Sequence, residues 1–503
     1  MKKLLIIMGI FFVSPIFAQQ TIGIFQNNKD IGNPKLAGSA IYDAETQTYT
    51  LTGAGYNIWF ERDEFHYLYN ELKGDFILTA NFAFEGEGNN AHRKIGWMLR
   101  SSEEDNDVHC SAVLHGDGLT VMQWRVLRGA FMRDPEDEIF APKPAYQILQ
   151  LERSGKNIIL RAAHPGEPLQ VIGSEEMENL PDKVLAGLFI CSHDSNIVEK
   201  AKVWNVRIDK PVGADYNPGR EVSLGCRLET MNVFDGKRKV IYKKDGRFEA
   251  PNWLPNGKKL LFNMDGSLFT IPVEGGQLEK LNTGSANRLN NDHCISFDGK
   301  MLGISNHNGT GSSVYVLPME GGTPREITNA TPSYLHGWSP NNKDLLYVAQ
   351  RNGIPIYNIY KKSIKGGNEI ALTDNKPGEH VDGCEYSPDG KYIYYNGSRS
   401  GTMQIWRMKS DGSDKEQLTF DQYNDWFPHI SPDGKWMVFI SFEPGIEFNA
   451  HPSYKRVMLR LMPVDGGAPK VIATLYGGQG TINVNSWSPD SRHISFVSNS
   501  GKE

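Results

Sequence analysis

The segment Ser387-Pro-Asp-Gly-Lys-Tyr-Ile-Tyr-Tyr395 decides the fold, because it joins a tight turn to a strand and recurs along the second half of the chain. Proline sets the φ angle of such a turn, glycine supplies a positive φ, and the alternating apolar residues that follow are typical of a β-strand. The related turns are Leu254-Pro-Asn-Gly257, Ser296-Phe-Asp-Gly299, Ser339-Pro-Asn-Asn342, Ser431-Pro-Asp-Gly434 and Ser488-Pro-Asp-Ser491. Their last residues, counted with Gly390, are 42, 43, 48, 44 and 57 residues apart.

A second turn follows within each repeat, so each repeat predicts two hairpins, or four antiparallel strands. These second turns are Glu274-Gly-Gly276, Glu320-Gly-Gly322, Lys365-Gly-Gly367, Asp411-Gly412 and Asp465-Gly-Gly467. Four-stranded units at this period are typical of propeller blades. The last repeat stops after its first hairpin at Ile494–Val497, and its missing half lies upstream at Met231–Val233 and Val240–Tyr242. The sequence therefore predicts a six-bladed β-propeller closed by strands from both of its ends.

On these turns and their Gly-Gly partners, residues 227–503 resemble the TolB-type propeller family. That resemblance implies a fold far more than a function, since the family includes a periplasmic scaffold protein, the propeller halves of some peptidases, and oligogalacturonate lyases. No G-x-S-x-G motif is present, which argues against a peptidase. The lyase pattern is not matched residue by residue, so the resemblance assigns no catalytic residue.

The first half of the chain shows no such repeat and alternates short strands with turns, which predicts a β-sandwich of the jelly-roll type. Gly53–Trp59, Gly74-Asp-Phe76 and Ile95–Arg100 resemble concanavalin-like, laminin-G-like domains. We therefore expect an all-β protein with a signal peptide at 1–18, a sandwich at 19–209, a linker at 210–226 and the propeller at 227–503. The candidates for a sugar-binding groove in the sandwich are Trp59, His66, Arg100, His115, Gln123 and Trp124.

The N-terminus predicts export, because Lys2-Lys3 precedes the apolar run Leu4–Val13 and a plausible cleavage point at Ala18-Gln19. This run is too short to span a bilayer, and no later segment is apolar enough to do so. The net charge of −6 and the lack of a long basic run argue against nucleic acid as a partner. We expect a periplasmic or secreted protein without a membrane span.

Histidines gather where the inner strands of the predicted blades begin, and the loops at that face surround the propeller axis. Only 13 histidines occur in 503 residues, so their clustering favours a site. A long loop at 442–456 is predicted to cover the axis as a lid. The predicted catalytic residues are His293, His336, His429, His451, Tyr454 and Lys455, and the predicted substrate-binding residues are Glu249, Asp382, Asp425, Arg351, Arg399 and Arg456. A divalent metal is a possible cofactor, with His293, His336, His380 and Asp382 as candidate ligands.

These residue types suit β-elimination on a uronic acid of an anionic oligosaccharide or polysaccharide, by a lyase or a dehydratase. A histidine or tyrosine would remove the proton at C5, while a metal or a cationic side chain would neutralise the neighbouring carboxylate. Anionic carbohydrate is therefore the predicted partner. A non-catalytic propeller of TolB type that binds glycan or envelope protein is the alternative. A glycoside hydrolase is the third possibility, with its two carboxylates drawn from Glu249, Asp292, Asp382 and Asp425.

Overall fold

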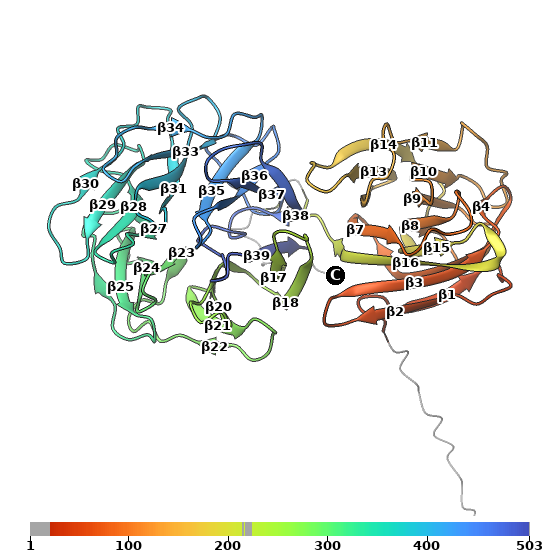
Figure 1. Ribbon diagram of the computed structural model, residues 1–503, viewed down its shortest axis with the longest axis horizontal. Helices are drawn as coiled ribbons and strands as arrows, with labels where there is room; N and C mark the ends of the chain where they lie inside the picture. Colours follow the sequence, from red (N-terminus) through yellow and green to blue (C-terminus); the bar gives the residue numbers. More distant parts are fainter. Residues whose placement is uncertain (1–20, 214–215, 217–223, 502–503) are drawn as a thin grey trace, which may run out of the picture.

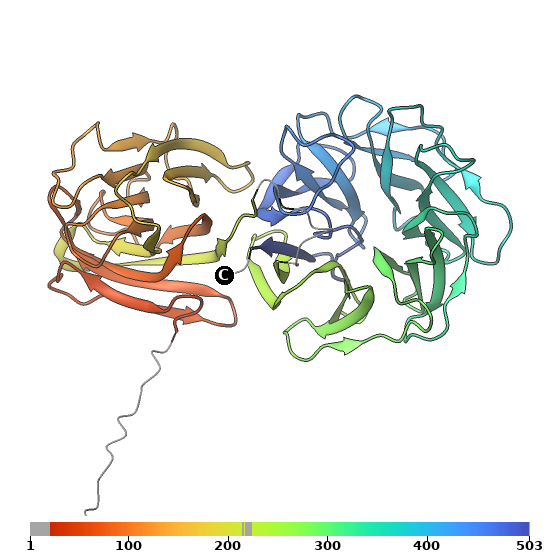
Figure 2. The same ribbon diagram turned by 180° about the vertical axis from the view of Figure 1, so that it is seen from behind.

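The computed structural model describes residues 21–213, 216 and 224–501, and all regular elements within them are β-strands. The predicted signal peptide and part of the predicted linker lie outside these residues. Figures 1 and 2 show two bodies side by side, a domain of two sheets formed by the first half of the chain and a ring of blades formed by the second. None of the described residues forms a helix that could cross a bilayer.

The first domain contains two seven-stranded antiparallel sheets. One runs in the order β1 (Asn27–Ile31), β6 (Phe65–Lys73), β15 (Lys183–Cys191), β8 (Lys94–Arg100), β9 (His109–His115), β10 (Thr120–Arg125), β11 (Glu138–Phe140). The other runs in the order β14 (Gln170–Glu176), β13 (Asn157–Ala163), β12 (Ile148–Ser154), β7 (Phe76–Phe84), β16 (Asp194–Asp209), β3 (Thr48–Gly55), β2 (Ser39–Asp43). β4 (Ile58–Trp59) and β5 (Arg62–Asp63) form a short hairpin.

Both sheets contribute to one apolar core, in which Leu68 and Trp97 of the first sheet meet Leu51 and Leu78 of the second. Trp124, one of the predicted groove residues, is also part of this core. Large aromatic side chains commonly fill such interiors, because they bury much apolar surface. The jelly-roll class of this domain stays a prediction.

The second half of the chain forms a six-bladed propeller among the described residues. The complete blades are β19 (Phe248–Trp253), β20 (Lys259–Met264), β21 (Ser267–Pro272), β22 (Glu279–Lys280); β23 (Leu289–Ile295), β24 (Met301–His307), β25 (Ser312–Pro318), β26 (Arg325–Glu326); β27 (Ser333–Trp338), β28 (Asp344–Ala349), β29 (Asn358–Ser363), β30 (Ile370–Ala371); β31 (Val381–Tyr386), β32 (Tyr392–Gly397), β33 (Gln404–Lys409), β34 (Glu416–Gln417); and β35 (Asn424–Ile430), β36 (Trp436–Phe442), β37 (Lys455–Pro463), β38 (Lys470–Gly477). The six-bladed prediction is confirmed.

The remaining blade closes the ring as the split repeat predicts. β17 (Gly225–Asn232) pairs with β39 (His493–Ser500) on one side and with β18 (Arg238–Asp245) on the other. The inner strand of this blade is reduced to an isolated bridge between Trp487 and Ile494. Pairing strands from both ends of the propeller leaves no open edge at the joint.

The repeated turn explains why each blade folds locally. In the turn at Ser387, the serine Oγ donates to Asp389 Oδ1 at 2.7 Å, and the same serine Oγ accepts the N–H of Tyr392 at 3.0 Å. Gly390 has a φ of 72°, a left-handed conformation that glycine adopts without steric cost. The turn thus satisfies its own polar groups and delivers Tyr392 as the first residue of β32.

A register shift interrupts the pairing of the inner strand with its neighbour in each of the five complete blades. In β31 the shift lies between Asp382 and Glu385, and Gly383 there has a φ of 57°. A bulge bends its strand and redirects side chains. These bulges turn side chains near the start of the inner strands toward the propeller axis.

Candidate functional site

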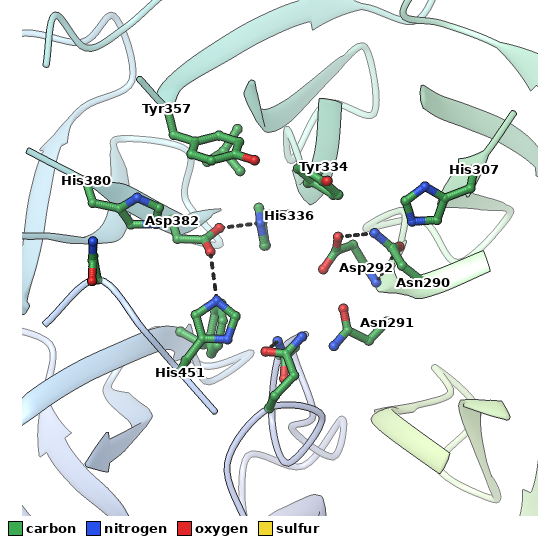
Figure 3. A pocket seen from close by; sticks show the side chains of 15 residues that line it. Asn290, Asn291, Asp292, His307, Tyr334, His336, Tyr357, His380, Asp382 and His451 are labelled. Carbon is green, nitrogen blue, oxygen red and sulfur yellow. Dashed lines mark hydrogen bonds and ion pairs between the residues drawn. The ribbon is translucent and has the colours of Figure 1, made fainter. Parts of the chain in front are cut away.

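A polar cavity of about 310 Å³ opens at the propeller axis, on the face where the inner strands begin (Figure 3). Side chains from four blades and from two connecting loops surround it. Its lining comprises Asn290, Asn291, Asp292, His307, Tyr334, His336, Val348, Tyr357, His380, Asp382, Phe427, Asn449, His451, Gln479 and Asn483. None of the described residues in this lining is Lys or Arg, so histidine is the only basic side chain that faces the cavity.

Asp382 and His336 form the central charged pair of the cavity. His336 Nε2 lies 2.7 Å from Asp382 Oδ1, and His451 Nε2 lies 3.8 Å from Asp382 Oδ2. Burial would raise the pKa of Asp382, but the charge of His336 and its hydrogen bond outweigh burial and hold this pKa well below its usual range. Burial would lower the pKa of His336, and the charge of Asp382 raises it instead. Asp382 is therefore an anion, and His336 gains protonation beside it.

Asp292 stands in the opposite protonation state in the same cavity. Burial raises the pKa of Asp292 to about 7; the charge of His336 opposes this shift and that of Asp382 adds to it. The Asn290 Nδ2–H donates to Asp292 Oδ2 at 2.7 Å, and the Asp292 N–H donates to Asn290 Oδ1 at 3.1 Å. Near neutral pH, a large fraction of Asp292 therefore retains a proton that it can donate, while Asp382 is ionised.

Aromatic rings pack against the two other histidines that line the cavity, His380 and His451. His380 packs between Tyr357 and Trp426, with ring centroids 5.5 Å and 5.7 Å away. His451 packs on Trp426 with a centroid separation of 4.5 Å. Burial lowers the pKa of both His380 and His451, which keeps these imidazoles neutral. The cavity thus combines neutral bases with one protonated and one ionised carboxyl group.

The structure brings together four of the predicted residues, His336, His380, Asp382 and His451, at one opening. His293 and His429, predicted to share it, do not line the cavity. His293 is buried in β23, 1% exposed. His429 lies deeper along β35, where Glu385 Oε2 at 2.8 Å and the Ile482 carbonyl at 2.7 Å engage its two ring nitrogens. The bulges in β23 and β35 shift the register that the sequence pattern assumed.

The proposed metal ligands do not assemble into a centre. Among the described residues, no group of three or more His, Cys, Asp or Glu side chains has the arrangement that holds a metal ion. His293 is outside the cavity, His336 is paired with Asp382, and His380 is packed between aromatic rings. These residues therefore do not fit a metal-binding site.

The loop at 442–456 reaches the cavity through one part only. Asn449 and His451 line the opening, as the lid prediction expects for His451. Tyr454 is instead buried against Tyr216 and Tyr476, with centroids 5.0 Å and 6.2 Å away.

The last two residues of the predicted loop, Lys455 and Arg456, belong to β37 rather than to the lid. Arg456 reaches the two-sheet domain, where it pairs with Glu152 at 2.5 Å and donates to Gln150 Oε1 at 2.7 Å. Lys455, at the start of β37, is exposed and does not line the cavity.

The other predicted substrate-binding residues are held by partners of their own, away from the cavity lining. Glu249 pairs with Arg247. Asp425 is buried and pairs with Arg460 at 2.5 Å. The remaining two are arginines: Arg351 is largely buried and pairs with Glu369 at 2.5 Å, and the exposed Arg399 lies 3.3 Å from Asp374 and 3.4 Å from Glu379.

Sequence reasoning missed several cavity residues, chiefly Tyr357 and Gln479. These residues lie in the longer connections, where no turn signature marks their position. Asp292 was considered only for the hydrolase alternative. Its place next to His293, in a segment that begins an inner strand, is the sequence signal for a position at the cavity.

The comparisons with known proteins concern the propeller. No family model matches the chain. The uncharacterized protein Atu1656 of Agrobacterium fabrum is 44% identical over 277 residues, which cover 55% of this chain and 92% of that protein. A solved structure of a provisionally named TolB from Agrobacterium tumefaciens shares 42% identity with a TM-score of 0.52, covering 55% of this chain and 99% of that one. The chain belongs to the TolB-like propeller family.

A more distant TolB-like relative is the Tol-Pal system protein TolB of Francisella tularensis. It is 24% identical over 270 residues, which cover 52% of this chain and 59% of that protein. The TolB-like relationship thus rests on sequence as well as on fold, and it spans about half of this chain.

Proposed function

We propose that the axial cavity of this TolB-like propeller is an active site for acid–base cleavage of a glycosidic bond. The observation that supports it is the pair of carboxyl groups held in opposite protonation states, Asp292 with a pKa of about 7 and Asp382 ionised beside His336. Two titratable groups whose surroundings separate their pKa values are the usual signature of an acid and its partner base. Glycoside hydrolases use such a pair of carboxyl groups.

In this proposal Asp292 donates its proton to the oxygen of the departing sugar as the glycosidic bond breaks. Water supplies the new hydroxyl group, and Asp382 accepts the proton of that water or stabilises the positive charge that develops on the sugar ring. His336 keeps Asp382 ionised, and Tyr357 and Phe427 contribute aromatic faces to the cavity lining. The general acid must begin protonated and the partner ionised, which is the arrangement of the cavity.

β-Elimination on a uronate is the second reaction that this cavity could support. The neutral imidazoles of His380 and His451 are suitable bases for it. Elimination also needs a positive group beside the substrate carboxylate, and the lining offers only His336, whose charge Asp382 already balances. Hydrolysis of an uncharged saccharide therefore fits better than elimination on an anionic one.

Binding without turnover is the third possibility, and the TolB-like relationship favours it. A propeller of this kind would hold a glycan or an envelope protein over the same opening. This possibility uses the same cavity, and it differs from catalysis only in that no product forms.

One experiment separates these three functions. The full chain is incubated with panels of uncharged and uronate-containing oligosaccharides, and new reducing ends and the ultraviolet absorbance of an unsaturated product are measured separately. Hydrolysis predicts reducing ends without that absorbance, and a loss of about 100-fold to 10,000-fold in kcat for Asp292→Asn. The matched control is Asp465→Asn, an exposed aspartate of a blade turn. An unsaturated product would replace hydrolysis by elimination, and binding without any product would leave the scaffold function.

We further propose that the protein acts in the periplasm or outside the cell. The basic start at Lys2-Lys3, followed by the apolar run Leu4–Val13, supports export. Cell fractionation with N-terminal sequencing of the mature chain tests this proposal. A full-length chain that stays in the cytoplasm would contradict it.

A further inference from the structure

A second cavity lies between the two domains, away from the propeller axis. Its volume is about 570 Å³, within the range of about 300–1,000 Å³ that is usual for ligand sites. One wall consists of β7, β12 and β16 of the two-sheet domain, and the other consists of the β17–β18 turn with β36, β37 and β38 of the propeller. We call it the junction cleft. It shares no lining residue with the axial cavity.

Three large aromatic side chains face the junction cleft from both domains. Trp204 comes from β16, Phe234 from the β17–β18 turn and Trp436 from the start of β36. Phe234 is 50% exposed, although its ring meets that of Trp436 edge-on at 5.7 Å. Both tryptophans are only half-buried. Exposed apolar surface gathered in one concave place marks a binding site more often than scattered apolar residues do.

Hydrogen bonds between the domains hold these rings in place. β16 is bulged between Trp204 and Arg207, and Asn205 there has a φ of 55°. The Asn205 Nδ2–H donates to the Gly236 carbonyl at 2.8 Å, and Asn205 Oδ1 accepts the Arg238 N–H at 2.8 Å. The bulge therefore clamps the turn that carries Phe234 next to Trp204. Bulges commonly redirect side chains beside binding sites.

The other end of the cleft is tied in the same way. The Val471 N–H donates to the Gly166 carbonyl at 3.0 Å, which joins β38 to the loop after β13. The two walls are thus connected at both ends, and the space between them is a formed cavity. A preformed site loses less free energy in ordering its groups when a ligand binds.

The polar groups of the cleft indicate what the ligand is. Among the described residues, the indole N–H groups of Trp204 and Trp436 donate to no other residue, and neither does the side-chain amide of Gln147. The buried charge in the lining, Arg238, is paired with Glu229 at 2.7 Å. The other two charged side chains of the lining, Asp235 and Lys470, are exposed and opposite in sign. The lining therefore offers aromatic faces and unused donors without an excess of either charge.

We propose that the junction cleft binds an uncharged saccharide. The apolar C–H face of a sugar ring packs on Trp204, Phe234 and Trp436, while its hydroxyl groups accept hydrogen bonds from the indole and amide N–H groups. An anionic sugar would meet the carboxylate of Asp235 as well as the ammonium group of Lys470, so the lining does not favour a negative charge. An apolar peptide would leave the donors of Trp204, Trp436 and Gln147 without partners, which is costly once the cleft is closed to water.

The test uses the full chain with cello-, xylo- and malto-oligosaccharides as uncharged probes, and calorimetry as the measurement. We expect at least one probe to bind, and Phe234→Ala to weaken that binding about 10-fold or more, since one stacked ring contributes on the order of 1.5 kcal/mol. Phe420→Ala is the matched control, because Phe420 is 75% exposed and lies outside the cleft. Trp204→Phe keeps a ring but removes a donor, so it should weaken binding less than Phe234→Ala does.

The outcomes distinguish this inference from the function proposed for the axial cavity. Asp292→Asn should bind the probe in the cleft as the wild type does, while it loses turnover. Binding that depends on Phe234 without any turnover would leave the cleft site standing and reject the active site. The inference is overturned if no uncharged probe binds, if Phe420→Ala matches Phe234→Ala, or if only uronate oligosaccharides or apolar peptides bind. Equal melting temperatures of the variants confirm that each is folded.

Discussion

Both domains bury carboxylates beside basic side chains, and a comparison of Asp63 with Asp382 shows why only some of these pairs form a site. Asp63 of the two-sheet domain is 0% exposed and lies between Arg100 at 2.7 Å and Arg125 at 2.8 Å. Asp382 of the propeller lies 2.7 Å from His336, and 14% of its side chain is exposed at the axial opening. The residue types are similar, but the two surroundings differ in what they permit.

The difference lies in the partners. Both oxygens of Asp63 accept from guanidinium groups, which never release their protons, and the pKa of Asp63 falls to about 2 because these charges outweigh burial. The partner of Asp382 is an imidazole, which can gain or lose a proton near neutral pH. A buried ion pair is therefore structural where its charges are permanent and the space is filled. It is a candidate site where one charge can change beside a cavity.

The largest effect is expected for Asp63→Asn. This change leaves Arg100 and Arg125 charged in a dry interior with no anion, and breaking such a buried pair costs about 3–5 kcal/mol of unfolding free energy. Urea denaturation, followed by a probe in the two-sheet domain, measures it. The control is Asp182→Asn, where Asp182 is 60% exposed beside Lys73 at 3.4 Å. A loss no greater than that of the control would contradict a structural role for the Asp63 cluster.

Asp382→Asn should lower the stability less than Asp63→Asn does, and it should lower the activity more. His336 can release its proton when the anion is removed, so no unpaired charge remains buried, and the loss of unfolding free energy should be about 1–2 kcal/mol. Turnover should fall about 100-fold or more, because the ionised partner of the acid is gone. Denaturation curves and kcat measured on one preparation test both halves. A stability loss equal to that of Asp63→Asn would place Asp382 among the structural pairs.

The stability of the propeller should depend on pH through Asp292. The pKa of Asp292 rises from 3.8 to about 7 on folding, so the native state binds more protons than the unfolded state between these values. The contribution of Asp292 to stability therefore falls as pH rises from about 4 to about 7. Asp292→Asn should flatten this decline, and Asp465→Asn should not. Melting temperatures across this pH range measure it, and unchanged slopes would show that Asp292 is ionised throughout.

The fold of the propeller could be predicted because its signals are local and repeated. The turn at Ser387–Gly390 needs no distant residue to form, and the matching halves at Met231–Val233 and Ile494–Val497 revealed the closure. The axial opening was found for the same reason, since the repeat placed the segments at His336 and Asp382 on one face. The local chemistry of the repeated turns therefore predicted the propeller fold and the location of the axial cavity.

The detailed membership of the site could not be predicted. A bulge in each inner strand changes which side chains point to the axis, and this change moved His293 and His429 out of the opening. Partners that are distant in sequence could not be predicted either. Arg456, for example, forms an ion pair with Glu152 of the other domain. Tyr357 lies in a connection without a repeated signature. Long-range packing, rather than local propensity, selects these residues.

The smallest effect is expected for Lys455→Ala, because the sequence predicts Lys455 on the lid and the structure places it outside the cavity lining. Both His451 and Lys455 were predicted to act above the axis, but only His451 lines the cavity, 3.8 Å from Asp382. His451 lies beside Asp382 and is not the acid or the base of the proposed hydrolysis, so His451→Ala should lower kcat by about 10-fold, less than Asp382→Asn does. Lys455→Ala removes an exposed side chain at the start of β37, so its unfolding free energy should stay within about 0.5 kcal/mol of wild type and its kcat should be unchanged. Steady-state kinetics of the two variants on one substrate decide the point. A large loss in Lys455→Ala would mean that the loop closes further over the axis when substrate is bound.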